Sequence, residues 1–164
     1  MRPVMGKKQR AILYAGLWMV LIFAFSAFSG DESSLQSGRV VALVLSIVRG
    51  LFGENTAVAL ERAGLAFFIR KAAHFTEYAV LGFLVARALF LNGIRPWMPA
   101  ILICAAYACL DEFHQSFVPG RSMQLRDVCI DSSGAIVGVL LFLAVCALKR
   151  ADTSASAREQ VRER

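Results

Sequence analysis

The side chains that could do chemistry in this 164-residue chain lie at the ends of its last three apolar segments. Histidines and carboxylates there could bind a cation, move a proton or orient a polar ligand. They are His74 and Glu77 at the start of one segment, Asp111, Glu112, His114 and Gln115 at the end of the next, and Asp127 and Asp131 at the start of the last. Two interpretations are open for each side chain, a structural ion pair and membership of one shared polar chamber.

Helical spacing arranges these side chains in three stripes, since residues three or four positions apart lie on the same face of a helix. The stripes are Lys71, His74, Glu77 and Tyr78; Asp111, His114 and Gln115; and Asp127, Asp131, Gly134 and Gly138. Glycines at such intervals let membrane helices approach closely, so Gly134 and Gly138 are expected to be packing residues. The two aspartates share this face, and we therefore expect their carboxylates to point into a helical bundle.

Four long apolar segments can position these stripes. The chain is 57% hydrophobic, which is more than a soluble single domain of this length can bury. Crossing about 30 Å of hydrocarbon takes roughly 20 residues of helix. Segments of about this length are residues 11–28, 72–91, 97–117 and 128–148. The sequence predicts an all-α membrane bundle of four transmembrane helices. Because Lys7 and Lys8 precede the first segment, a cleaved signal peptide is an alternative interpretation of it.

The distribution of charge predicts the orientation of the bundle. Most of the 18 lysines and arginines fall in the terminal segments or beside the turn at residues 92–96. Since basic loops stay in the cytoplasm, we expect a multi-pass protein of the cytoplasmic membrane with both termini inside. The net charge of +6 then reflects orientation, and no nucleic-acid motif occurs. We predict one domain over residues 1–150, with its motifs between 70 and 140, and a flexible cytoplasmic tail at 151–164.

The connection between the first two predicted spans is expected on the extracytoplasmic side. Residues 40–48 are apolar but too short to cross, and Arg39 and Arg49 flank them. This pattern predicts an amphipathic, surface-lying or re-entrant helix. Residues 57–69 predict a second helix that leans on the membrane. The pair is either a lid over the polar side chains or a simple connector.

Arg121 follows a proline and a glycine after the third predicted span. Proline followed by glycine suits a type II turn, which would carry Arg121 over the polar ends of the spans. An arginine fork can bind a carboxylate or a phosphate. Pairing with Asp127 or Glu112 and binding of a phosphate both stay open.

The order and spacing of three motifs resemble those of the VanZ-like family of membrane proteins. The motifs are Lys71-x2-His74-x2-Glu77-Tyr78, Asp111-Glu112-x2-Gln115 followed by Pro119-Gly120-Arg121, and Asp127-x3-Asp131-x2-Gly134-x3-Gly138. The resemblance implies a small multi-span bacterial protein that affects susceptibility to glycopeptides of the teicoplanin type, with no settled reaction. The residues that match by position are Lys71, His74, Tyr78, Asp111, Glu112, Gln115, Arg121, Asp127 and Gly134. Asp131 departs from the family pattern, which commonly has an asparagine there.

Three functions from different classes fit these residues, and whether the protein is an enzyme stays open. In the first, the chamber binds or modifies a membrane lipid or lipid-linked envelope precursor, with Arg121 and Lys71 on an anionic headgroup. The second is an intramembrane metal-dependent hydrolase or transferase with His74, Asp111 and His114 as candidate ligands, although no HExxH motif occurs. The third is a non-enzymatic adaptor for a partner membrane protein. The sequence by itself predicts no bound cofactor.

Overall fold

The computed structural model describes residues 5–162, which form six helices and no strand. The helices are α1 (Lys7–Ser26), α2 (Gly30–Phe52), α3 (Glu54–Arg62), α4 (Leu65–Leu91), α5 (Trp97–Gln115) and α6 (Leu125–Arg162). Four of them, α1, α2, α4 and α6, are long and apolar enough to cross a membrane. The predicted all-α membrane bundle with four candidate spans is therefore confirmed.

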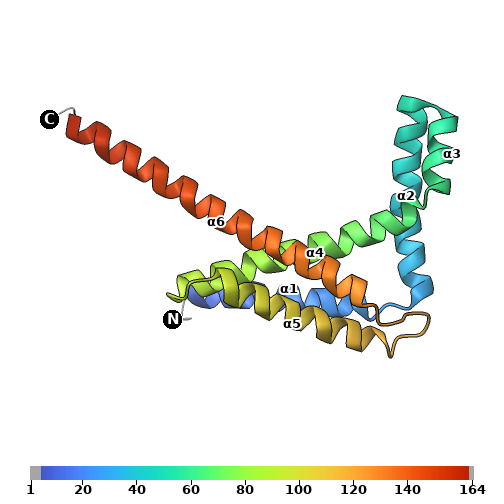
Figure 1. Ribbon diagram of the computed structural model, residues 1–164, viewed down its shortest axis with the longest axis horizontal. Coiled ribbons are helices and arrows are strands. Elements are labelled where there is room, and N and C mark those ends of the chain that lie inside the picture. The colour runs from blue at the N-terminus through green and yellow to red at the C-terminus, as the bar shows by residue number, and fades with distance from the viewer. Residues whose placement is uncertain (1–4, 163–164) are drawn as a thin grey trace.

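The helices α1, α4, α5 and α6 pack together; the first part of α2 lies against them, and its far part forms with α3 a hairpin that projects from the bundle (Figure 1). α1 begins and α6 ends on the side of the molecule opposite this hairpin. At the other end of the bundle, α1 and α5 end while α4 and α6 begin, and we call this the polar end. Chain topology thus brings the start or end of four helices to one place.

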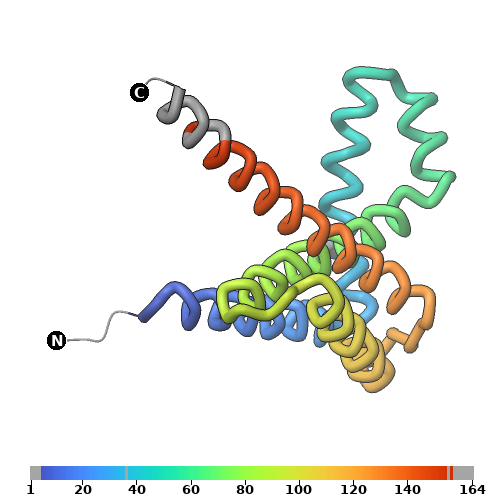
Figure 2. The backbone as a smooth tube through the Cα atoms, turned by 60° about the vertical axis from the view of Figure 1, so that its left-hand side comes forward, coloured from blue at the N-terminus to red at the C-terminus, as the bar shows by residue number. Residues whose placement is uncertain are grey.

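The four candidate spans differ in one member from those expected. α2 is long and apolar enough to cross a membrane, whereas α5, predicted as the third span, is not. α5 is less apolar because its last turns carry Asp111, Glu112, His114 and Gln115. α2, in contrast, runs crosswise to α1 in both views (Figure 2), so it does not share the direction of the bundle.

Several predicted boundaries need correction. The helix expected over residues 57–69 is interrupted at Gly64, whose φ of 84° breaks the helix between α3 and α4. The second predicted span consequently begins at Leu65 rather than at residue 72. α6 continues as a helix into the segment expected to be a flexible tail, while residues 163–164 lie outside the described residues. The flexibility of that tail stays a prediction.

Glycines set the close approach of α4 and α6, the two helices with the most extensive mutual packing. A Cβ placed on Gly134 or Gly138 would collide with the backbone of α4 at Phe75 or Ala79. A Cβ on Gly82 of α4 would collide with the backbone of Ala135 in return. The expectation that Gly134 and Gly138 are packing residues is confirmed, and their stripe faces α4.

The apolar core lies next to this contact. Its fully buried members include Leu81 and Tyr78 of α4, Cys104 of α5 and Val139 of α6. α1 adds Ile22 to the same core, and its Trp18 indole N–H donates to the backbone carbonyl of Glu77 at 2.9 Å. Since the core anchors all four bundle helices, it holds their polar ends in fixed register.

Candidate functional site at the polar end

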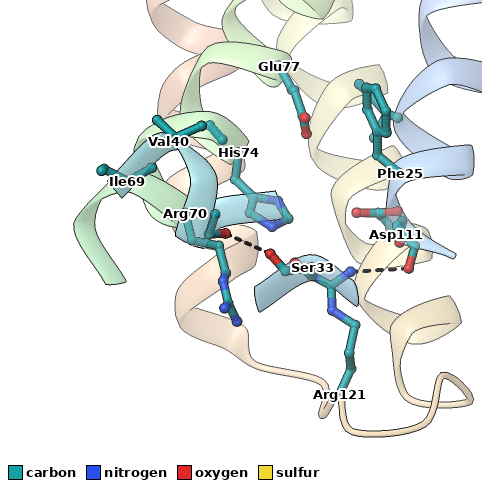
Figure 3. A pocket seen from close by; sticks show the side chains of 13 residues that line it. Phe25, Ser33, Val40, Ile69, Arg70, His74, Glu77, Asp111 and Arg121 are labelled. Carbon is teal, nitrogen blue, oxygen red and sulfur yellow. Dashed lines mark hydrogen bonds between the residues drawn. The ribbon is translucent and has the colours of Figure 1, made fainter. Parts of the chain in front are cut away.

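A cavity of about 210 Å³ lies at the polar end of the bundle. His74, Asp111 and Arg121 line it from α4, α5 and the α5–α6 loop, and Figure 3 shows their side chains facing the same space. α1 and α2 complete the wall with Phe25, Ser26, Ser33, Ser37 and Val40. Groups separated by almost 100 residues in sequence therefore share one polar chamber.

An apolar groove continues from this cavity toward the middle of the bundle. It has a volume of about 490 Å³ and lies between α1 and α4, where Trp18, Leu21, Ala72, Thr76 and Val80 extend its wall. Cavity and groove have six lining residues in common, namely Ile22, Phe25, Val40, Ile69, Ala73 and Glu77. The two spaces are thus neighbours, one lined by charged groups and the other mainly by apolar side chains.

Lys71 and Asp127 form an ion pair beside the cavity. The Lys71 ammonium lies 2.6 Å and 2.5 Å from the two oxygens of the Asp127 carboxylate. Their side chains are only 14% and 10% exposed, so the pair is well shielded. Neither residue lines the cavity. This contact joins the first stripe of α4 to the first turn of α6.

Arg121 makes a contact that the sequence did not predict. Its Nη1 donates to the backbone carbonyl of Ser26 at 3.2 Å, as the dashed line in Figure 3 shows. The ion pairs among the described residues include no contact of Arg121, so pairing with Asp127 or Glu112 was wrong. Lys71 instead pairs with Asp127, and one oxygen of Glu112 accepts from the Gln124 backbone N–H at 2.8 Å.

The α5–α6 loop is held against the start of α2, and this contact places Arg121. The Gly30 N–H donates to the Pro119 carbonyl at 3.0 Å. A Cβ on Gly30 would collide with the backbone of Gly120, whose φ of 74° itself favours glycine. Two glycines thus let the loop and α2 touch through their backbones, and the next residue, Arg121, reaches the cavity.

His74, Asp111 and Asp131 form a compact buried group at the cavity wall. One potential ligand atom of each lies within 4.8 Å of the others. His74 Nδ1 is 3.7 Å from Asp131 Oδ1, which is outside hydrogen-bond distance. The Gln115 amide donates to Asp111 Oδ2 at 3.0 Å and so orients that carboxylate. Three helices therefore each contribute one member of the group.

The remaining predicted site residues lie in different surroundings. Glu77 lines both the cavity and the groove. Tyr78 is fully buried in the core next to the ring of Tyr107, with ring centroids 6.2 Å apart, and does not line the cavity. His114 stacks on Phe23 with ring centroids 4.3 Å apart. It is not part of the group with His74, and Asp131 takes the place expected for it among possible metal ligands.

Sequence reasoning missed four polar residues of the site. Arg70 and Ser26 line the cavity, as do Ser33 and Ser37 of α2. Arg70 precedes His74 by four residues, so helical spacing could have found it. Ser26 lies near the end of the first predicted span, residues 11–28, which is also a usable signal. The α2 serines gave no such signal, because their position depends on the contact between Gly30 and Gly120.

Comparison with known proteins gives one match. A family model described as VanZ/LLP1 matches residues 11–147, which is most of the chain and includes every site residue named above. No curated protein and no solved structure matches the chain.

Proposed function

The chain belongs to the VanZ/LLP1 family, and on that basis we propose that it binds a lipid-linked component of the cell envelope. The anionic headgroup occupies the polar cavity, and the hydrocarbon chain lies in the adjoining groove between α1 and α4. Binding takes place at the extracytoplasmic face of the cytoplasmic membrane. The biological consequence is an altered susceptibility to glycopeptides of the teicoplanin type, which act on cell-wall precursors at that face.

The observation that carries this proposal is that the polar cavity and the apolar groove lie side by side and share six lining residues. A soluble ligand needs only the first, whereas a lipid needs both in contact. Arg121 and Arg70 bring cationic groups for an anionic headgroup to a cavity wall that Glu77 and Asp111 also line. Lys71, in contrast, is engaged by Asp127, so we assign the headgroup contact to the two arginines.

The orientation follows from charge and topology together. α1 begins and α6 ends on the side opposite the polar end. Lys7, Lys8 and Arg10 lie at the start of α1, and Lys149 and Arg150 lie late in α6. Basic segments favour the cytoplasmic side. The polar cavity then faces the extracytoplasmic side, where lipid-linked cell-wall precursors are exposed.

Replacement of Arg121 by alanine tests the proposal. We expect Arg121→Ala to lower the amount of anionic lipid retained by the purified protein at least tenfold, measured by native mass spectrometry. A charge-assisted arginine contact contributes about 1.5–3 kcal/mol, which corresponds to a tenfold or larger loss. In a strain whose teicoplanin tolerance depends on this protein, the same variant should abolish tolerance at unchanged protein level.

Arg39→Ala is the matched control. Arg39 is an exposed arginine of α2 that does not line the cavity, so this variant makes the same change of charge without touching the site. We expect it to retain lipid and tolerance. Equal lipid retention by Arg121→Ala and wild type, or equal losses in both variants, would refute headgroup recognition by Arg121.

A further inference from the structure

The carboxylate of Asp131 has an unusual environment at the end of the cavity. Its side chain is 0% exposed, and within the described part of the chain neither of its oxygens has a hydrogen-bond partner. A buried carboxylate without a donor or a counter-charge is strongly destabilising. A bound cation or a proton would remove this cost, and no lysine or arginine among the described residues forms an ion pair with Asp131.

Two side chains near Asp131 also have a buried polar atom without a hydrogen-bond partner. Asp111 is 2% exposed, and its Oδ1 has no hydrogen-bond partner among residues 5–162. The same holds for Nδ1 of His74, a side chain that is only 12% exposed. No lysine or arginine in the described part of the chain forms an ion pair with Asp131 or Asp111: Lys71 pairs with Asp127, and one nitrogen of Arg121 donates to the Ser26 carbonyl. One group that contacts all three side chains would satisfy them together.

We propose that His74, Asp111 and Asp131 bind a divalent cation of the first-row transition series. Two carboxylates and a neutral imidazole carry a charge of −2, which matches a divalent ion. Imidazole nitrogen combined with carboxylate oxygen suits Zn²⁺, Fe²⁺ or Mn²⁺, while Mg²⁺ and Ca²⁺ favour oxygen ligands throughout. This site goes beyond headgroup binding and stands without it.

The geometry allows one ion to reach all three ligands. Ligand bonds to such ions are about 2.0–2.2 Å long, so two donors on the same ion lie at most about 4.2 Å apart. His74 Nδ1 and Asp131 Oδ1, at 3.7 Å, already satisfy this limit. All three donor atoms lie within 4.8 Å of one another, and side-chain adjustments of under about 1 Å close the set.

Gln115 holds one of the proposed ligands, Asp111, in place. The Gln115 amide donates to Asp111 Oδ2, which fixes the carboxylate and leaves Oδ1 for the ion. Metal-ligating carboxylates are commonly held by such a hydrogen bond. His74 and Asp111 also line the cavity, so the free coordination positions of the ion face the space from which a ligand or water enters.

Metal binding by the purified full-length chain tests the site. The protein is prepared in a neutral detergent without anionic lipid, stripped with a chelator and titrated with Zn²⁺ or Mn²⁺ by calorimetry. We expect one ion per chain, and a Tm that rises by about 5–10 °C at a 100-fold excess over Kd. Asp131→Asn should weaken binding at least tenfold and remove the Tm shift.

Glu112→Gln is the matched control, because it also removes a buried carboxylate at the polar end while its amide oxygen can still accept from Gln124. Its ion affinity should stay within about threefold of wild type. Asp131→Asn has a second readout, since removing an unpaired buried charge should raise the Tm of the ion-free protein. This result also shows that the variant folds.

The outcome is decided by the wild-type protein and these two variants. No stoichiometric ion and no Tm shift in wild type would overturn the site, whatever the variants do. Wild-type affinity in Asp131→Asn, or an equal loss in Glu112→Gln, would overturn the assigned ligands. Since lipid is absent from the assay, failure here leaves the headgroup proposal standing, and loss of lipid binding in Arg121→Ala leaves the metal site standing.

Discussion

Gly138→Ala should lower the free energy of unfolding by about 3 kcal/mol, whereas Gly16→Ala should raise it by about 0.5–1 kcal/mol. At position 138 the added methyl group would collide with the backbone of Ala79, which cannot turn aside as a side chain can. α4 and α6 must then separate along their whole contact. At position 16 nothing lies within 4 Å of the new atom, so only the gain in helix propensity remains.

Unfolding titrations of the two purified variants in detergent measure these changes, with folded yield after size-exclusion chromatography as a second readout. Both variants add one methyl group to a glycine inside a helix, so a general intolerance of this protein to substitution would affect them equally. Equal stability of the two would mean that α4 and α6 do not approach each other as closely as their glycines allow. The polar end would then lack its main support.

Much of the fold could be predicted because it depends on local pattern. The length of the apolar segments indicated helices that cross a membrane, and the spacing of Gly134 and Gly138 indicated a packed face. The position of α2 against the α5–α6 loop could not be predicted, because it follows from a contact between two distant backbones at Gly30 and Gly120. Nothing in the sequence around residue 30 marks that contact.

The candidate site could likewise be predicted only in part. His74, Asp111 and Asp131 could be placed at one end of the bundle from topology alone, since neighbouring spans run in opposite directions. Their individual partners could not be predicted. Arg121 contacts a backbone carbonyl and His114 an aromatic ring. Such contacts depend on the position of the end of each side chain to within a few ångströms. Helical spacing does not determine that position.

Breaking the Lys71–Asp127 pair should have the second large effect. Removing one partner of a buried ion pair leaves an uncompensated charge and costs about 3–5 kcal/mol. Asp127→Asn should be the more damaging change, since it removes the carboxylate that pairs with the Lys71 ammonium, and the ring of Phe67, 5.3 Å away, is a weaker replacement. Lys71→Met should be milder, because Arg126 Nε lies 4.0 Å from Asp127 and its exposed side chain can approach further.

The double variant Lys71→Met/Asp127→Asn distinguishes a structural clamp from site chemistry. A structural clamp requires only that neither buried side chain carries an unpaired charge. The neutral pair should therefore recover most of the folded yield lost by Asp127→Asn. Lipid retention is measured on the same preparations. Because neither residue lines the cavity, the double variant should bind lipid as wild type does. Recovered yield without lipid binding would instead mean that Lys71 contacts the headgroup, and the assignment of that contact to Arg70 and Arg121 would be wrong.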